Sequence, residues 1–148
     1  MGVHRVELRA HCSGIDDLAA IRKGLEGIVG TDIDIQEKQD RSWHGAEQTN
    51  LMIELRRKNK AKLVLSKLGN NVLESLLNDD LVKRIDDRNV LHLRINLAEL
   101  CCGNIVISEP RKREPCVKIR IKLEVYPGQT AEEIGKSCIQ EALQSYDP

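Results

Sequence analysis

Residues 117–125 read VKIRIKLEV, and they carry the clearest structural signal in the chain. Aliphatic and charged side chains alternate strictly along this stretch, which is the period of a β-strand with one buried face and one solvated face. Three of its four charged residues, Lys118, Arg120 and Lys122, are cations. The stretch therefore predicts a strand whose exposed face is mostly positive.

The segments on either side of this strand are predicted to be turns. The charged sequence EPRKREP, residues 109–115, precedes it, and Tyr126-Pro127-Gly128 follows it. Thr130 and Glu133 then have the spacing of a capping box, which predicts the start of the last helix. We expect that helix to bury Ile134, Cys138, Ala142 and Leu143.

Upstream of residue 109, the hydrophobic pattern predicts further strands and helices. Ser13 is expected to cap the first helix, which Gly30 ends, and Gly69 is expected to separate the next two helices. The polar residues 36–50 are interpreted as a loop or a wide hairpin connection. Alternating aliphatic residues predict strands at 3–11, 33–35, 51–55, 89–95 and 105–107, and helical spacing predicts helices that include residues 63–68 and 72–85.

The predicted order of elements is β-α-β-β-α-α-β-β-β-α. Strands follow one another in groups and do not alternate strictly with helices, which favours an α+β fold. We expect a mixed or antiparallel sheet with helices packed on one face. The chain has 148 residues without an internal repeat or a linker, so one domain over residues 1–148 is predicted.

The composition limits how the chain could recognise a nucleic acid. The formal net charge is zero, so binding would depend on a local positive patch. One Trp, two Tyr and no Phe cannot provide a platform on which successive bases stack. If RNA is the ligand, recognition of phosphates and RNA shape is therefore favoured.

The cysteines and histidines show no spacing typical of a metal site. The chain has five cysteines and no CxxC pair, which indicates free thiols in a reducing compartment. The adjacent Cys101 and Cys102 are interpreted as buried or semi-buried thiols. No apolar run is long enough for a membrane span, and we expect a cytoplasmic protein with no membrane, metal or cofactor partner.

Catalytic motifs are also missing from the sequence. It contains no P-loop, no GxGxxG and no GxSxG, and no nucleophile, base and oxyanion donors can be assembled from it. A group of acids could bind a cation, but a solvated helix end and turn is the favoured interpretation. We therefore expect a protein that is not an enzyme. The acids in question are Asp79, Asp80, Asp86 and Asp87.

Three clusters of cations are the candidate RNA-binding residues, because Arg and Lys side chains suit phosphate oxygens. The first lies in residues 55–67, which contain no acid, the second lies in the turn before the 117–125 strand, and the third lies on that strand. The hypothesis requires these clusters to converge in space. Their members are Arg56, Arg57, Lys58, Lys60 and Lys62; Arg111, Lys112 and Arg113; and Lys118, Arg120 and Lys122.

The single Trp of the chain lies in a polar segment beside a glycine, as Trp43-His44-Gly45. Loops on a rigid scaffold often carry function. Trp43 and His44 are therefore candidates for contact with RNA or with a second subunit. The alternative is that Trp43 folds back over the edge of the core.

The chain resembles the archaeal RNA-binding proteins described as predicted exosome subunits. The resemblance is carried by VELRAHCSGIDD (6–17), the WHG loop (43–45) followed by LMIELRRK (51–58), VLHLRINLAEL (90–100) and KIRIKLEVYPG (118–128). It implies a fold similar to the fifth large-subunit ribosomal protein, RNA binding, a role in RNA processing and possible self-association. It implies no catalytic residues.

Two functions follow from these observations. The first is an RNA-binding protein accessory to archaeal RNA processing or degradation, with structured or double-stranded RNA and exosome proteins as partners. The second is an interaction or scaffold subunit that docks a partner protein or forms a homodimer, without contacting nucleic acid. An enzyme is the least favoured interpretation.

Overall fold

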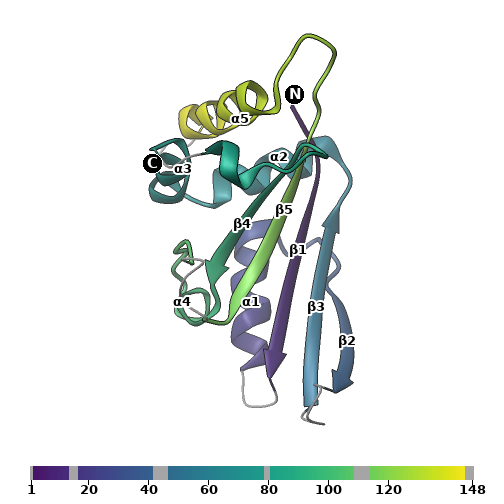
Figure 1. Cartoon of the computed structure of the whole chain (residues 1–148). Coiled ribbons are helices and arrows are strands. Elements are labelled where there is room, and N and C mark those ends of the chain that lie inside the picture. The colour runs from purple at the N-terminus through teal and green to yellow at the C-terminus, as the bar shows by residue number, and fades with distance from the viewer. Residues whose placement is uncertain (1, 14–16, 42–46, 79–80, 109–113, 146–148) are drawn as a thin grey trace. The chain divides into compact units, whose positions relative to one another are not determined.

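The structure is a computed structural model, and it describes residues 2–13, 17–41, 47–78, 81–108 and 114–145. It contains one five-stranded antiparallel sheet in the order β2-β3-β1-β5-β4, with β5 running between β1 and β4 (Figure 1). The predicted α+β class with an antiparallel sheet is confirmed. The strands are β1 (Val3–Ser13), β2 (Gln36–Arg41), β3 (Glu47–Leu55), β4 (Val90–Asn96) and β5 (Cys116–Leu123).

Five α-helices and one short 3-10 helix complete the described secondary structure. Gly69 has a φ of 91° between the second and third helices, as the sequence predicted. The third helix is assigned only as far as Asn78, short of the expected residue 85, and Leu81–Arg84 form a separate 3-10 helix. The helices are α1 (Leu18–Val29), α2 (Lys58–Lys67), α3 (Asn70–Asn78), η1 (Leu81–Arg84), α4 (Leu97–Cys101) and α5 (Ala131–Ser145).

Contacts between residues divide the chain into two compact units. Unit 1 comprises residues 1–6, 54–93 and 120–148, and unit 2 comprises residues 7–53 and 94–119. Four strands, β1, β3, β4 and β5, contribute residues to both units. The single domain over residues 1–148 stays a prediction.

In unit 1, α5 packs against α2, α3 and η1. The predicted capping box opens this helix: the Glu133 N–H donates to Thr130 Oγ1 at 3.2 Å, and the Thr130 N–H donates to the Glu133 carboxylate at 3.3 Å. Cys138 and Ala142 are buried as expected, Ile139 is also fully buried, and Ile134 and Leu143 are only partly buried. These contacts give unit 1 a helical layer whose start the local sequence specifies.

In unit 2, α1 begins one turn later than the sequence suggested. Ser13 is the last residue of β1 and does not cap the helix. Asp17 takes that role, because its side chain accepts a hydrogen bond from the Ala20 N–H at 3.2 Å. The helix ends as predicted at Gly30, where φ is 94°.

Residues 36–50, interpreted as a loop or a wide hairpin connection, contain β2 and the start of β3, whereas residues 33–35, where a strand was expected, precede β2 and form no strand. β2 pairs with β3 in antiparallel register, from Gln36 opposite Met52 to Arg41 opposite Glu47. β2 lies at the edge of the sheet, where one face and one edge meet water and charged side chains are favourable. Backbone pairing therefore holds β2 in place, although it lacks the alternating aliphatic residues by which the other strands were predicted.

The strand expected at residues 105–107 is reduced to one isolated bridge, and a short helix that was not predicted, α4, precedes it. Asn96 caps α4 by accepting a hydrogen bond from the Glu99 N–H at 2.9 Å. Ile107 makes only one isolated bridge, to Ile95.

We predict opposite effects on stability when either of two glycines of α1 is replaced by alanine. A Cβ on Gly24 would lie 2.6 Å from Leu100 Cγ and 3.0 Å from the Leu100 carbonyl oxygen, whereas a Cβ on Gly27 would meet nothing within 4 Å. Gly24→Ala should therefore lower the free energy of unfolding by about 1–3 kcal/mol, through overpacking against α4. Gly27→Ala should raise it by about 0.5–1 kcal/mol, through helix propensity alone.

Urea denaturation of the two variants and the unsubstituted chain measures both effects. Each variant adds one methyl group to the same helix, so Gly27→Ala is a matched control for Gly24→Ala. Equal stability changes in the two variants would show that α1 does not approach α4 as closely as described.

Candidate nucleic-acid interface

In unit 2, α1 covers one face of the sheet and leaves the other face open. Arg22 of α1 donates a hydrogen bond to Glu37 of β2 at 3.1 Å. Glu37 is in register with the buried Leu51 of β3, so both residues lie on the face that α1 covers. Asn50 precedes Leu51 in the strand and points to the opposite face, where it hydrogen bonds to His11 of β1.

Three cations lie on this open face in unit 2, one on each of three neighbouring strands. They are Arg9 of β1, Lys118 of β5 and Arg94 of β4, which we call the unit 2 cations. Arg9 forms an ion pair with Glu7. Arg94 and Lys118 are exposed and form no ion pair with any residue that the structure describes. The residues before and after each cation are buried: Leu8 and Ala10, Leu93 and Ile95, and Val117 and Ile119.

Unit 1 carries a second group on the exposed sides of the adjacent strands β1 and β5. Its members are Arg5, Arg120 and Lys122, which we call the unit 1 cations. The Lys122 ammonium donates to the backbone carbonyl of Arg88. Arg5 and Arg120 are exposed and, within the described ranges, have no carboxylate partner. Each unit therefore presents cations whose charge is not cancelled by a neighbouring acid.

The cluster predicted in residues 55–67 is different, because acids from other elements neutralise much of it. Arg56 pairs with Glu54 at 2.9 Å, and Lys58 hydrogen bonds to Glu124. Lys62 of α2 pairs with Glu141 of α5 at 2.9 Å. The structure thus brings acids to a segment that has none of its own.

The same pairing shifts the pKa of two of these acids, Glu124 and Glu141. Hydrogen bonding to Lys58 lowers the pKa of Glu124, and hydrogen bonding to Lys62 lowers the pKa of Glu141. Both carboxylates are therefore held in the charged form that cancels the neighbouring ammonium. Of the remaining predicted residues, Arg57 is exposed with no ion pair to a described residue, and Lys60 lies in α2.

Five of the predicted contact residues lie outside the described residues. They are Arg111, Lys112 and Arg113 in the turn before β5, and Trp43 and His44 between β2 and β3.

Three cations of the candidate site were not predicted from the sequence. Arg5, Arg9 and Arg94 lie on the exposed faces of β1 and β4, beside strand β5 whose cations were predicted. The alternation in residues 3–11 and 89–95 already placed them on solvated strand faces. What was missing was the order of the strands, which makes β1 and β4 the neighbours of β5.

The side chain of Asp86 closes the turn that precedes β4, and this role is structural. Its Oδ1 accepts hydrogen bonds from the N–H groups of Arg88 and Val90 at 2.9 and 3.0 Å. Its Oδ2 lies 2.8 Å from Nε2 of His92. These contacts, with the His92 hydrogen bond as the largest cause, lower the pKa of Asp86 to about 2. Asn89, at φ 62°, completes the turn.

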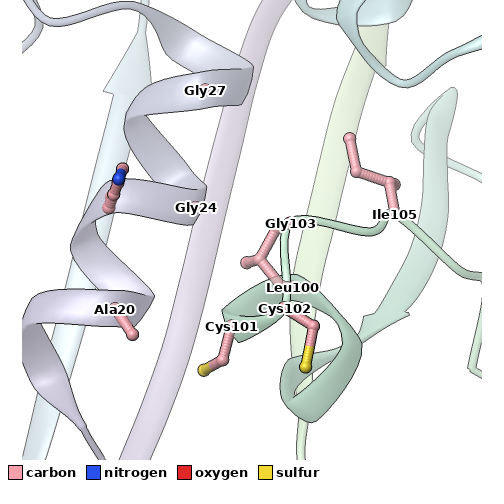
Figure 2. A pocket seen from close by; sticks show the side chains of 9 residues that line it. Ala20, Gly24, Gly27, Leu100, Cys101, Cys102, Gly103 and Ile105 are labelled. Atoms are coloured by element: carbon pink, nitrogen blue, oxygen red, sulfur yellow. The ribbon is translucent and has the colours of Figure 1, made fainter.

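A pocket of about 530 Å³ lies between α1 and the region around α4 in unit 2. Figure 2 shows Ala20, Gly24 and Gly27 along α1 on one side, and Leu100 with the two adjacent cysteines on the other. Contrary to expectation, both of these cysteines, Cys101 and Cys102, are exposed, because α4 ends there and turns its last residues to the surface. None of the five cysteines, all of which the structure describes, forms a disulfide.

Comparison with known proteins identifies related sequences and folds. A family model described as RNA binding matches residues 5–124. None of the curated proteins matches the chain. None of the described helices is long and apolar enough to cross a membrane.

Solved structures of archaeal proteins have a similar fold. The chain is similar to Mth689, a DUF54 protein from Methanothermobacter thermautotrophicus, with a TM-score of 0.72 and 17% identity over 97% of this chain and 99% of that one. It is similar to AF2318 from Archaeglobus fulgidus, with a TM-score of 0.72 and 21% identity over 95% and 99%. For SSO0741 from Sulfolobus solfataricus the values are 0.68 and 18%, over 93% and 98%.

The hydrogen bonds of Asp86 predict a pH dependence of stability. The pKa of this carboxyl is about 2 in the folded chain and 3.8 without these contacts, so its charge stabilises the fold above pH 3.8. That contribution is lost as the pH falls from about 4 to about 2. Because the side chain is 33% exposed, we expect about 1 kcal/mol after allowance for solvent screening.

Asp86→Asn keeps a side-chain oxygen for the turn but removes the titrating charge. Urea denaturation of this variant and the unsubstituted chain between pH 7 and pH 2 measures the difference. The stability gap between them should be largest at neutral pH, narrow below about pH 4 and close only near pH 2. A gap that is constant across this range would assign the stabilisation to groups other than Asp86.

Proposed function

The chain belongs to the RNA binding family, and we propose from that premise that it binds RNA through the exposed face of its sheet. The observation that carries this proposal is the set of unneutralised cations on neighbouring strands. Arg5 and Arg120 in unit 1, and Arg94 and Lys118 in unit 2, project from strands whose other face is buried. Forked guanidinium groups and ammonium groups in such positions suit phosphate oxygens.

The proposed ligand is structured or double-stranded RNA. In the part of the chain that the structure describes, Tyr126 is the only Phe, Trp or Tyr, and it lies outside the strands. The sheet carries histidine rings but no described Phe, Trp or Tyr, so it lacks the platform on which modules that read single strands stack a run of bases. Phosphates and 2′-hydroxyls are the groups that double-stranded RNA presents to proteins. Cations on flat, neighbouring strands fit that kind of ligand.

We propose that the α2 region contributes less to the affinity for RNA than the sheet does. Arg56, Lys58 and Lys62 each have a carboxylate partner, which lowers the local positive potential and competes with phosphate. Arg57, which has no such partner among the described residues, is the member of that cluster most suited to contact RNA.

We also propose that the binding is non-catalytic and serves archaeal RNA processing or degradation, in association with exosome proteins. The resemblance described above supports this role, and the similar solved structures are from archaea. Reconstitution of the chain with archaeal exosome proteins tests the association. A chain that neither joins the assembly nor changes its RNA degradation would remove this part of the proposal.

Neutralising the exposed cations should weaken RNA binding and its salt dependence together. The variants are Arg5→Ala/Arg120→Ala for unit 1 and Arg94→Ala/Lys118→Ala for unit 2. Each lost phosphate contact should reduce the slope of log K against log salt by about 0.7–0.9, or about 1.5 for each double variant. Fluorescence anisotropy with a labelled RNA hairpin, titrated at several salt concentrations, measures the slope and the affinity.

The matched control is Arg56→Ala/Lys62→Ala, which removes the same number of charges from residues that are paired with acids. This control should change the slope by clearly less than either sheet variant. A larger loss of affinity or slope in the control than in the sheet variants would indicate that the α2 region, and not the sheet, contacts RNA. A flat salt response of the unsubstituted chain would reject RNA binding through phosphates altogether.

A further inference from the structure

Unit 2 includes part of both edge strands of the sheet, β4 and β2, and their outer backbone groups are satisfied differently. The end of β4 is covered by the segment that follows α4. The Asn96 N–H donates to the Val106 carbonyl at 2.8 Å. The Ser108 N–H donates to the Arg94 carbonyl, also at 2.8 Å. Among the described residues, the backbone of residues 36–40 in β2 pairs only with β3. The outer edge of β2 is therefore open to a further strand.

Charged side chains usually protect such an edge, because most strands that approach it would bring like charges together. The order of the charges in β2 allows one exception. Residues 37–41 read EKQDR, so the signs run negative, positive, neutral, negative, positive. Reading this stretch backwards exchanges every sign about the central Gln39. An antiparallel copy of β2 centred on Gln39 would therefore set an opposite charge against every charged residue of the stretch.

Other symmetric registers lack this match. The outer edge takes its backbone groups from alternate residues, the same ones in each copy, so one residue faces its own equivalent at the centre of the pair. A register centred on Lys38 or on Asp40 brings two like charges together there. With Gln39 at the centre, Glu37 faces Arg41, and Lys38 faces Asp40. Facing opposite charges stabilise a strand pair and facing like charges destabilise it, so the charges select this register.

The same pairing would join the open faces of two copies of unit 2. Glu37 lies on the face that α1 covers, so the exposed Lys38, in register with Asn50, lies on the open face. Facing residues of an antiparallel pair lie on the same side of the sheet. The open face of one copy would therefore continue into that of the other, with the unit 2 cations of both copies on one side.

We propose that β2 pairs with β2 of a second copy of this chain, in antiparallel register centred on Gln39. This inference goes beyond the proposed RNA binding and does not depend on it. Two Glu37–Arg41 pairs and two Lys38–Asp40 pairs stabilise the dimer. A carboxylate has two oxygens, so Glu37 can accept from Arg41 of the second copy while it keeps its bond with Arg22 of its own chain.

Lys38 allows a test that disturbs the single chain little. Within one chain, Lys38 is in register with Asn50 and Asp40 with Gln48, so neither faces a charge on β3. Lys38→Glu sets two acids opposite each other at two places in the dimer. Sedimentation velocity at low ionic strength, over a range of protein concentrations, measures the dimer dissociation constant. We expect it to rise about tenfold or more, because two attractions become repulsions.

Lys38→Glu/Asp40→Lys exchanges the two charges and restores opposite charges across the dimer. Its dissociation constant should return to within about threefold of that of the unsubstituted chain, which a merely local disturbance of β2 would not produce. Lys67→Glu is the matched control, because it changes the net charge as Lys38→Glu does but lies on α2. This control should leave the dissociation constant unchanged. Far-ultraviolet circular dichroism of each variant checks that the fold is retained.

Three results would overturn the inference. The unsubstituted chain could stay monomeric at every concentration. Lys38→Glu could dimerise as the unsubstituted chain does, which would place the contact elsewhere on the surface. The effect of Lys38→Glu could also persist in the double variant, which would show that charge pairing across β2 does not hold the dimer. These measurements contain no RNA, so each of these results leaves the proposed function intact.

Discussion

The structure depends on the burial of aliphatic side chains on one face of the sheet. Val117, Ile119 and Ile121 of β5 are fully buried, and burial of each such side chain contributes about 1.5–3 kcal/mol. Side chains alternate between the two faces of a strand, so a shift in pairing by one residue would expose all three of these residues. The same shift would bury Lys118 and Arg120. The core therefore determines both the register of β5 and the outward direction of its cations.

This constraint explains why the sheet, and not α2, is the better candidate interface. On a strand with a buried opposite face, the adjacent residues point away from a cation, and only acids two residues along or on neighbouring strands can reach it, as Glu7 reaches Arg9. A cation on α2 can be reached by acids of other elements, as Glu141 of α5 reaches Lys62. A cluster that looks strongly positive along the chain can thus be partly neutralised in the fold.

Two turns of the chain are closed by hydrogen bonds to side chains within the turns themselves. Asp86 orders the start of β4 through two backbone N–H groups and His92. Gln129 closes the turn that presents Tyr126. Both are local hydrogen-bonded motifs, and each fixes a side chain near the end of a strand.

The sequence alone determined the elements whose signal is local. Alternation specified β1, β4 and β5, Thr130 and Glu133 specified the start of α5, and Gly30 and Gly69 specified the ends of helices, because each depends on neighbours within a few residues. Only the tertiary structure decided the rest. It made a strand of polar residues in β2 by backbone pairing, and it set β1 and β4 beside β5. It also brought Glu124 and Glu141 to Lys58 and Lys62, because pairing of strands and approach of distant charges depend on residues far apart in the chain.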